Sequence, residues 1–561
     1  MTYDLKILGG TIIDGSGDAR RQGDIGVQNG KIVALGEALG EAQHTIEARG
    51  RVVCPGFVDI HTHYDAQLLW DPALSISPWH GVTTVVIGNC GFGIAPTRPA
   101  HRNLILRTLE KVEGMSIDAL KTGLGEEWEF ETFPEYLDLI ERQGVAINVG
   151  VLLGHTPIRL EVMGEDAVRR VATRQEIAGM SDIIREGMDA GALGFATSHA
   201  PTHHGFDGHP VPSRLASMGE LSELVGAMAE SHRGIMQATV GPTLFNDEFR
   251  VLANQHDIPI TWTALLAGMS GPGSHRRHQA QALKLIEDGL NVVPQISCRP
   301  LNFDFDFNDP FVFEMRPLFE ATMKTDREGR RRIYAETEFR AAFKKDSAPG
   351  ARNALAGWAE RAIVSHAPGH KAKEERLLAE VAAEEGVDPI DLALDLSLES
   401  NLGARFRFPV VNFEENEVEE LIRDPNMLVA LSDAGAHASQ LCDACYSTHL
   451  LGHWVREKNV LELERAIQML TSRPAEVFGI SDRGLLTIGR PADIVLLDPD
   501  TVGAGPLRRV HDLPGGGDRL VVDAYGIDAV VVNGTIIRQN GEDMRNGSAL
   551  PGRLLRNGIA A

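Results

Sequence analysis

The chain has 561 residues, of which 43% are hydrophobic and 24% charged, a composition typical of a globular protein and not of a disordered one. A single hydrophobic core rarely grows beyond about 250–300 residues, so we expect one large domain and at least one smaller unit. Acidic residues outnumber basic ones by 78 to 54, which gives a net charge of −24. This charge argues against nucleic acid and anionic membrane surfaces as partners.

The sequence contains no recognisable targeting or membrane segment. Residues 1–6 lack the basic and apolar regions of a signal peptide, and no run approaches the ~18 apolar residues of a membrane span. We therefore predict a cytoplasmic protein. The five cysteines are too scattered for a disulfide framework, and Cys442 and Cys445 lack the second pair of a common zinc motif.

The two ends of the chain have similar patterns of short strands. Residues 1–55 alternate apolar strand segments with turns, including the hairpin signal Asn29-Gly30. Residues 476–561 return to this pattern, and the segment 533–537 repeats the Gly-Thr-Ile-Ile of residues 10–13. We predict that both ends fold into one small β-sandwich.

Between these ends, residues 56–475 alternate apolar strands with amphipathic helical segments, the pattern of parallel βα units. Eight such units predict an α/β protein with a (β/α)8 barrel, whose active site lies at the carboxyl ends of the strands. The candidate strands are residues 52–60, 83–88, 146–153, 192–197, 234–238, 259–263, 291–296 and 427–431.

A segment at about 300–365 interrupts this rhythm. It is rich in Asp, Phe, Arg and Lys and has no clear βα pattern. Long segments of this kind inside a compact domain are often functional. We expect an insertion that covers the site.

Two histidines follow the first barrel strand. His61 and His63 lie two residues apart, so on an extended chain both side chains point to the same side, while Thr62 points away. Imidazole is a ligand for zinc, iron and related ions. The nearby Asp65 can hydrogen-bond an imidazole and orient it without binding the ion itself. The alternative is a pair of hydrogen-bonded polar residues at a strand end. The pattern favours a metal site.

Two further residues follow barrel strands at the same level. Cys90 comes after the strand 83–88, and a thiolate there would bind zinc, although a buried cysteine can also serve as a small apolar residue. Asp433 follows the last strand, where it can contact the metal and accept a proton from metal-bound water. The alternative for Asp433 is a turn or helix cap. We expect both residues in the site.

These motifs resemble those of the amidohydrolase superfamily and, within it, the D-aminoacylase (N-acyl-D-amino-acid deacylase) family. The resemblance runs nearly end to end. It implies a barrel that carries a β-sandwich, zinc on His61, His63 and a bridging Cys90, and Asp433 as metal ligand and catalytic acid/base. It also implies cleavage of the amide bond of an N-acylated D-amino acid. The matching segments are PGFVDIHTH (55–63), GNCG (88–91), GHTPIR (154–159), GALGFAT (191–197), SDAG (432–435) and GRPADIV (489–495).

The sequence departs from this family on strands five and six. The family has a histidine ligand on each, but residues 235–240 and 260–265 contain none. Either the enzyme works with one tightly bound ion or other residues replace these ligands. The barrel-top histidines that could complete a site or bind substrate are His155, His199, His203 and His204.

Two arginines that follow strands, Arg159 and Arg299, are candidates for binding a substrate carboxylate with two hydrogen bonds. We predict a zinc-dependent hydrolase for a small acylated substrate, with one or two ions and a possible homo-oligomer. Two alternatives stay open. The chain could open a cyclic amide or cleave another unusual amide, or it could be an inactive, metal-poor binding or scaffold protein.

Overall fold

The largest part of the molecule is a barrel of parallel strands. The computed structural model describes residues 2–36, 39–205, 208–269, 271–350, 355–544 and 550–560. Eight strands pair in the order β17-β12-β11-β10-β9-β8-β7-β6. They are β6 (Phe57–Asp59), β7 (Val82–Ile87), β8 (Asn148–Gly154), β9 (Gly194–Ser198), β10 (Ile235–Thr239), β11 (Ile260–Thr263), β12 (Val292–Ile296) and β17 (Leu428–Val429).

The sheet closes beyond β17. Ala434 forms a parallel bridge with Thr62, and its carbonyl oxygen accepts a hydrogen bond of 2.7 Å from the backbone N–H of His63. The predicted (β/α)8 barrel is therefore confirmed, and the last strand returns to the first at the level where the site residues were expected.

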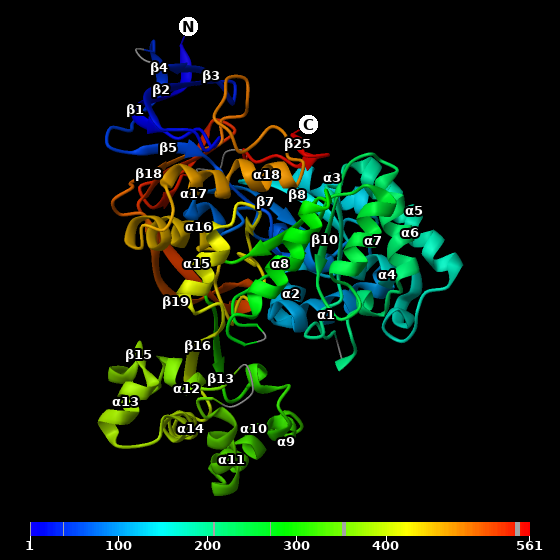
Figure 1. The fold of residues 1–561 in the computed structure, drawn as a ribbon, viewed down its shortest axis with the longest axis vertical. Coiled ribbons are helices and arrows are strands. Elements are labelled where there is room, and N and C mark those ends of the chain that lie inside the picture. The colour runs from blue at the N-terminus through cyan, green and yellow to red at the C-terminus, as the bar shows by residue number, and fades with distance from the viewer. Residues whose placement is uncertain are drawn as a thin grey trace.

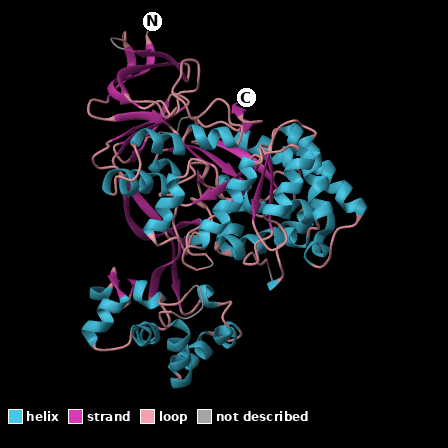
Figure 2. Ribbon diagram, in the orientation of Figure 1, coloured by secondary structure: helices cyan, strands magenta, loops and turns pink. Residues whose placement is uncertain are grey.

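Helices cover the outside of the barrel (Figures 1 and 2). The sequence favours α5 (Arg174–Ala190), because the Thr173 side chain caps its first turn and the Glu176 carboxylate accepts a hydrogen bond from the backbone N–H of Thr173. Its buried residues recur with helical spacing and form one apolar face. The strands from β9 to β12 are connected through α6 (Met218–Ala229), α7 (Asn246–His256) and α8 (Ser274–Glu287). No helix in the described ranges is long and apolar enough to cross a membrane.

The chain passes from one sheet to the other within the predicted first strand, 52–60. Its first half, β5 (Val52–Pro55), pairs in the terminal sheet, and its second half is β6 of the barrel. Gly56 lies between them, where a Cβ atom would be 2.0 Å from Thr83 Oγ1. The predicted single strand is therefore two strands in different sheets.

Both chain ends contribute to one nine-stranded sheet, with the order β23-β22-β21-β18-β5-β1-β2-β3 and β4 beside β1. The ends join where β5 pairs antiparallel with β18, for example Val53 with Leu496. The strands are β1 (Tyr3–Ile12), β2 (Arg21–Gln28), β3 (Lys31–Gly36), β4 (Ala42–Glu47), β18 (Ile494–Leu497), β21 (Ile527–Val532), β22 (Thr535–Gln539) and β23 (Glu542–Asp543). A separate hairpin, β19 (Gly503–Leu513) with β20 (Gly517–Tyr525), lies beside the barrel.

The insertion is a lobe of its own that extends from β13 (Leu301–Asp306) to β16 (Arg405–Val411). It is longer than the predicted 300–365, because the chain forms β14 (Ile363–His366), β15 (Arg376–Leu377), α13 (Leu378–Glu385) and α14 (Pro389–Glu399) before it returns to the barrel. Aromatic rings dominate the separate core of the lobe. Figure 1 shows the lobe projecting from the barrel, joined to it through β13 and β16.

Candidate metal centre

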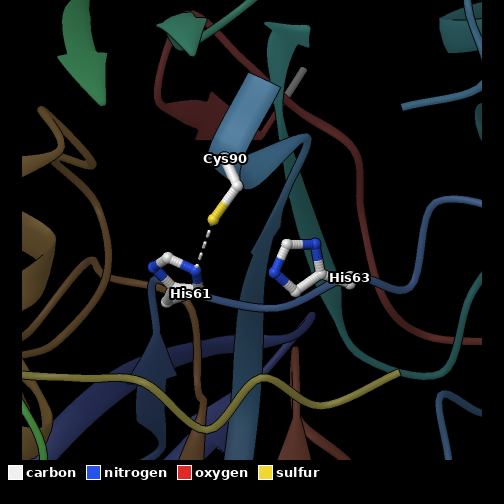
Figure 3. A group of neighbouring side chains, drawn as sticks. All are labelled: His61, His63 and Cys90. Carbon is white, nitrogen blue, oxygen red and sulfur yellow. Dashed lines mark hydrogen bonds between the residues drawn. The ribbon is translucent and has the colours of Figure 1, made fainter. Parts of the chain in front are cut away.

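Three potential ligand side chains converge after the first two barrel strands. His61 and His63 follow β6, and Cys90 lies in the turn after β7 with a backbone φ of 56°. Figure 3 shows the side chains gathered around one space. His61 Nε2 lies 3.3 Å from Cys90 Sγ, and one ligand atom from each residue lies within 4.8 Å of the others. All three residues are buried.

A fourth candidate ligand approaches from the opposite end of the sheet. Asp433, after β17, has its Oδ1 atom 3.3 Å from His61 Nε2 and 3.8 Å from His63 Nε2. The next turn packs against the histidine segment, where a Cβ atom on Gly435 would lie 2.6 Å from the carbonyl oxygen of His63. The structure therefore brings together the four residues predicted to bind metal.

Gln295, in β12, fixes the orientation of His61. His61 Nδ1 lies 2.7 Å from Gln295 Oε1, and Gln295 Nε2 donates to Thr261 Oγ1 at 3.2 Å. Because an amide oxygen can only accept, His61 Nδ1 carries the proton. The other ring nitrogen, Nε2, is therefore unprotonated in neutral His61 and faces the cluster as a metal ligand.

A second glutamine holds the backbone of Cys90. The Cys90 N–H donates to Gln237 Oε1 of β10 at 2.7 Å. Burial disfavours the thiolate, but the charges and hydrogen bonds of His61 and His63 outweigh burial and lower the pKa of Cys90 to about 7. A thiol that loses its proton this readily is suited to bind a metal ion.

A cavity of about 310 Å³ opens onto this cluster. The ends of β10 and β11 line it with Thr239, Val240, Thr263 and Ala264. These are the strands where the family motif has two histidines, and Thr263 Oγ1 instead donates to Thr239 Oγ1 at 3.3 Å. The described residues therefore offer no imidazole at either strand end.

His203 and His204, both in the loop after β9, have different environments. His203 lines the cavity, its Nδ1 lies 2.7 Å from Ser198 Oγ, and its ring centroid is 5.2 Å from that of Phe92. Burial lowers the pKa of His203 to about 3, so the ring is neutral. His204 is not among the described residues that line the cavity, and its Nδ1 lies 3.2 Å from Thr202 O. Of these two histidines, His203 is the one placed to contact a substrate.

His155 and Arg159, which the sequence predicts to bind substrate, are buried and are not among the described residues that line the cavity. Both side chains are 0% exposed and bind Glu220, which is also buried. His155 Nε2 lies 3.0 Å from Glu220 Oε1, and Arg159 Nη1 donates to the same oxygen. Burial disfavours the charged form of Glu220, but His155 and Arg159 outweigh it and hold the pKa of Glu220 below its ordinary value. We predict that this cluster has a structural role.

We therefore expect Arg159→Met to destabilise the protein by roughly 3–5 kcal/mol, since it leaves a buried carboxylate without its cation. Urea unfolding measures this change. Arg169→Met is the matched control, because the Arg169 ion pair with Glu165 is exposed and contributes at most about 1 kcal/mol. Unchanged stability combined with a raised KM would return Arg159 to a substrate-binding role.

Arg299 is also withdrawn from the cavity. Its Nε atom lies 3.3 Å from Asp443 Oδ1, and its Nη1 atom contacts Cys445 Sγ. Asp443, and not Arg299, is among the described residues that line the cavity. Burial raises the pKa of Asp443 to about 6, although the charge of Arg299 opposes this shift. The arginine is therefore already paired with an acid of this chain.

Sequence reasoning missed four residues of the site: Gln237, Gln295, His437 and Asp443. The glutamines are polar residues within apolar barrel strands, a signal that could have marked them as inward-facing. His437 and Asp443 lie in the long loop after β17 and line the cavity. His437 follows the SDAG segment and Asp443 lies between Cys442 and Cys445, but neither pattern points to the cavity, so only the fold places them there.

We expect Gln295→Leu to weaken metal binding by about 10–100-fold, because His61 loses the acceptor that fixes its ring. Metal titration with a competing chelator measures this affinity. Gln295→Glu is the matched control, since a carboxylate still accepts from His61 Nδ1, and it should retain most of the affinity. Equal affinity in the Leu variant and the natural chain would show that Gln295 does not position His61.

Known proteins resemble this chain over most of its length. A model of the amidohydrolase family matches residues 44–538. The D-aminoacylase of Alcaligenes xylosoxydans xylosoxydans is 29% identical over 96% of this chain and 95% of its own length. The N-acyl-D-aspartate deacylase of the same organism is 29% identical over 99% of this chain and 96% of its own.

A solved structure shares the same fold across nearly all of both chains. The N-acyl-D-glutamate deacylase of Bordetella bronchiseptica, complexed with zinc and a phosphonate inhibitor that mimics the tetrahedral intermediate, is 26% identical to this chain. The two superpose with a TM-score of 0.67, covering 99% of this chain and 100% of the other.

Proposed function

The chain belongs to the amidohydrolase family, and we propose that it is a metal-dependent hydrolase that cleaves the amide bond of N-acylated D-amino-acid compounds. The observation that carries this proposal is the convergence of His61, His63, Cys90 and Asp433 below one cavity. The relatives named D-aminoacylase and N-acyl-D-aspartate deacylase supply the class of substrate.

The donor set fits zinc. Two imidazoles and a thiol whose pKa is about 7 lie together in a buried position, and these are the ligand types that zinc prefers. A zinc ion held by His61, His63, Cys90 and Asp433 would activate water and polarise the substrate carbonyl. Thr239, Val240, Thr263 and Ala264 are poor donors for a second ion. We therefore propose one tightly bound ion per chain.

Asp433 is the group placed to move the proton. Its Oδ1 atom lies within 3.8 Å of both histidine Nε2 atoms, and the carboxylate lines the cavity. It would accept a proton from the attacking water and donate it to the leaving nitrogen as the amide bond breaks. Neutral His203, whose Nδ1 is engaged by Ser198, has Nε2 left to orient the substrate.

Release of free amine from matched N-acetyl-D- and N-acetyl-L-amino acids, and from their carboxamides, tests this function. We expect hydrolysis that favours the D series and that stops when a chelator removes the ion. Absence of hydrolysis from every compound in a preparation that contains metal would refute the proposal.

We propose that the lobe from β13 to β16 does not act as a lid, since Leu301 is its one described residue that lines the cavity. Asp306 pairs with Arg405, so residues 307–404 can be replaced by a two-residue Asn-Gly turn. Phe305, Phe406 and Phe408 would lose their packing when the lobe is removed, so each is also replaced by threonine in this variant. We expect metal content and kcat/KM close to those of the full chain.

Leu301→Ala in the full chain is the companion variant, and it should raise KM because it removes a cavity wall. Steady-state kinetics of both variants measure the contrast. A large loss of kcat/KM in the excised chain, with metal content intact, would restore the lid hypothesis.

A further inference from the structure

The charge of the cavity wall limits the kind of substrate that it can hold. Among the described residues that line the cavity, none is lysine or arginine, and two are acids, Asp433 and Asp443. Much of the remaining wall is apolar, from Phe92, Val112, Leu266, Met269, Leu301 and Leu431. The described part of the wall therefore offers no lysine or arginine side chain to a substrate carboxylate.

Guanidinium groups near the wall already have partners. Arg299 is paired with Asp443, behind the wall. Arg519 binds both oxygens of Asp512 at 2.7 and 2.9 Å and donates to Ser75 O at 3.0 Å. Neither can turn to a ligand without leaving an acid or a carbonyl oxygen unpaired.

Arg214 lies next to the cavity residue His203. Its Nη1 atom donates to the backbone oxygen of His203 at 3.0 Å, and Arg214 itself is not among the described residues of the wall. His203, His437 and the metal-site histidines are the other basic groups there, and burial keeps His203 neutral. The charge of Arg214 is therefore also tested by substitution.

A carboxylate that leaves water for such a cavity loses hydration without gaining a lysine or arginine partner, and the charge of the proposed ion is already balanced by the Cys90 thiolate and the Asp433 carboxylate. We infer that the substrate is neutral where an N-acylated amino acid has its free carboxylate: an N-acyl amine or an N-acyl-amino-acid carboxamide with apolar substituents. This inference rests on the proposed amide hydrolysis and changes the class of amine released. The reaction is otherwise the same, with water adding to the carbonyl carbon and the amine leaving protonated.

The experiment compares kcat/KM for N-acetyl-D-leucine, N-acetyl-D-leucinamide and N-acetyl-isopentylamine with the metal-loaded full chain. We expect both neutral compounds to exceed the free acid by at least about tenfold, equivalent to about 1.4 kcal/mol. Equal or faster hydrolysis of the free acid would overturn the inference while amide hydrolysis stands. Failure of all three compounds would refute the proposed function and the inference with it.

Two variants test the physical cause. Met269 is 51% exposed and lines the cavity, so Met269→Arg adds a cation to the wall with little risk to folding. It should raise kcat/KM for the free acid relative to the carboxamide by several-fold, compared with Met269→Gln as the uncharged control. Arg214→Gln should leave that ratio unchanged. A selective loss of free-acid hydrolysis in Arg214→Gln would show that Arg214 binds the carboxylate and would overturn the inference.

Discussion

Replacing Asp433 with asparagine is expected to lower kcat by about 10²–10⁴-fold, because an amide oxygen accepts a proton far more weakly than a carboxylate. Its Oδ1 atom lies 3.3 Å from His61 Nε2, so the side chain is close to the attacking water of the proposed reaction. The asparagine is similar in size, and we expect the fold and most of the bound metal to be retained. Steady-state kinetics with metal analysis of the same preparation measure both quantities.

Asp443→Asn is the matched control for Asp433→Asn, because both acids line the cavity but only Asp433 contacts the histidine pair. The loss of kcat should be much smaller at Asp443. A near-normal kcat in Asp433→Asn would show that another group handles the proton.

Replacing His61 and His63 together with alanine is expected to remove the ion and to reduce hydrolysis to the background rate. Two of the four proposed ligands are then lost, and Cys90 and Asp433 alone make a weak site. Because both histidines are buried, the unfolding transition of the variant shows whether the fold survives.

His204→Ala is the control for the histidine pair, since His204 lies in a barrel-top loop but is not among the described residues that line the cavity. This variant should keep its metal and its activity. Full metal content in the double alanine variant would refute the assignment of the site.

The sequence predicted the barrel and the meeting of the four site residues for the same physical reason. His61, Cys90 and Asp433 each follow a strand, and a parallel barrel brings the carboxyl ends of its strands to one face. Sequence spacing also placed His63 beside His61. Local pattern was therefore sufficient for this part of the site.

The local sequence pattern did not predict which side chains from distant segments contact each other. Arg159 follows a strand, as a substrate-binding arginine would, but its partner Glu220 lies 61 residues away. Gln295 contacts His61 across 234 residues. The insertion boundary was missed because α13 and α14 have amphipathic patterns like those of barrel helices, and only their packing assigns them to the lobe.

The metal content of the purified natural chain, measured as ions per chain after removal of loosely bound metal, tests the central proposal most directly. The buried group of His61, His63, Cys90 and Asp433 predicts about one tightly held ion per chain. Two tightly held ions would contradict the view that the ends of β10 and β11 provide no second site. A chain that binds no ion at neutral pH, even when zinc is added, would contradict metal-dependent hydrolysis and favour an inactive binding protein.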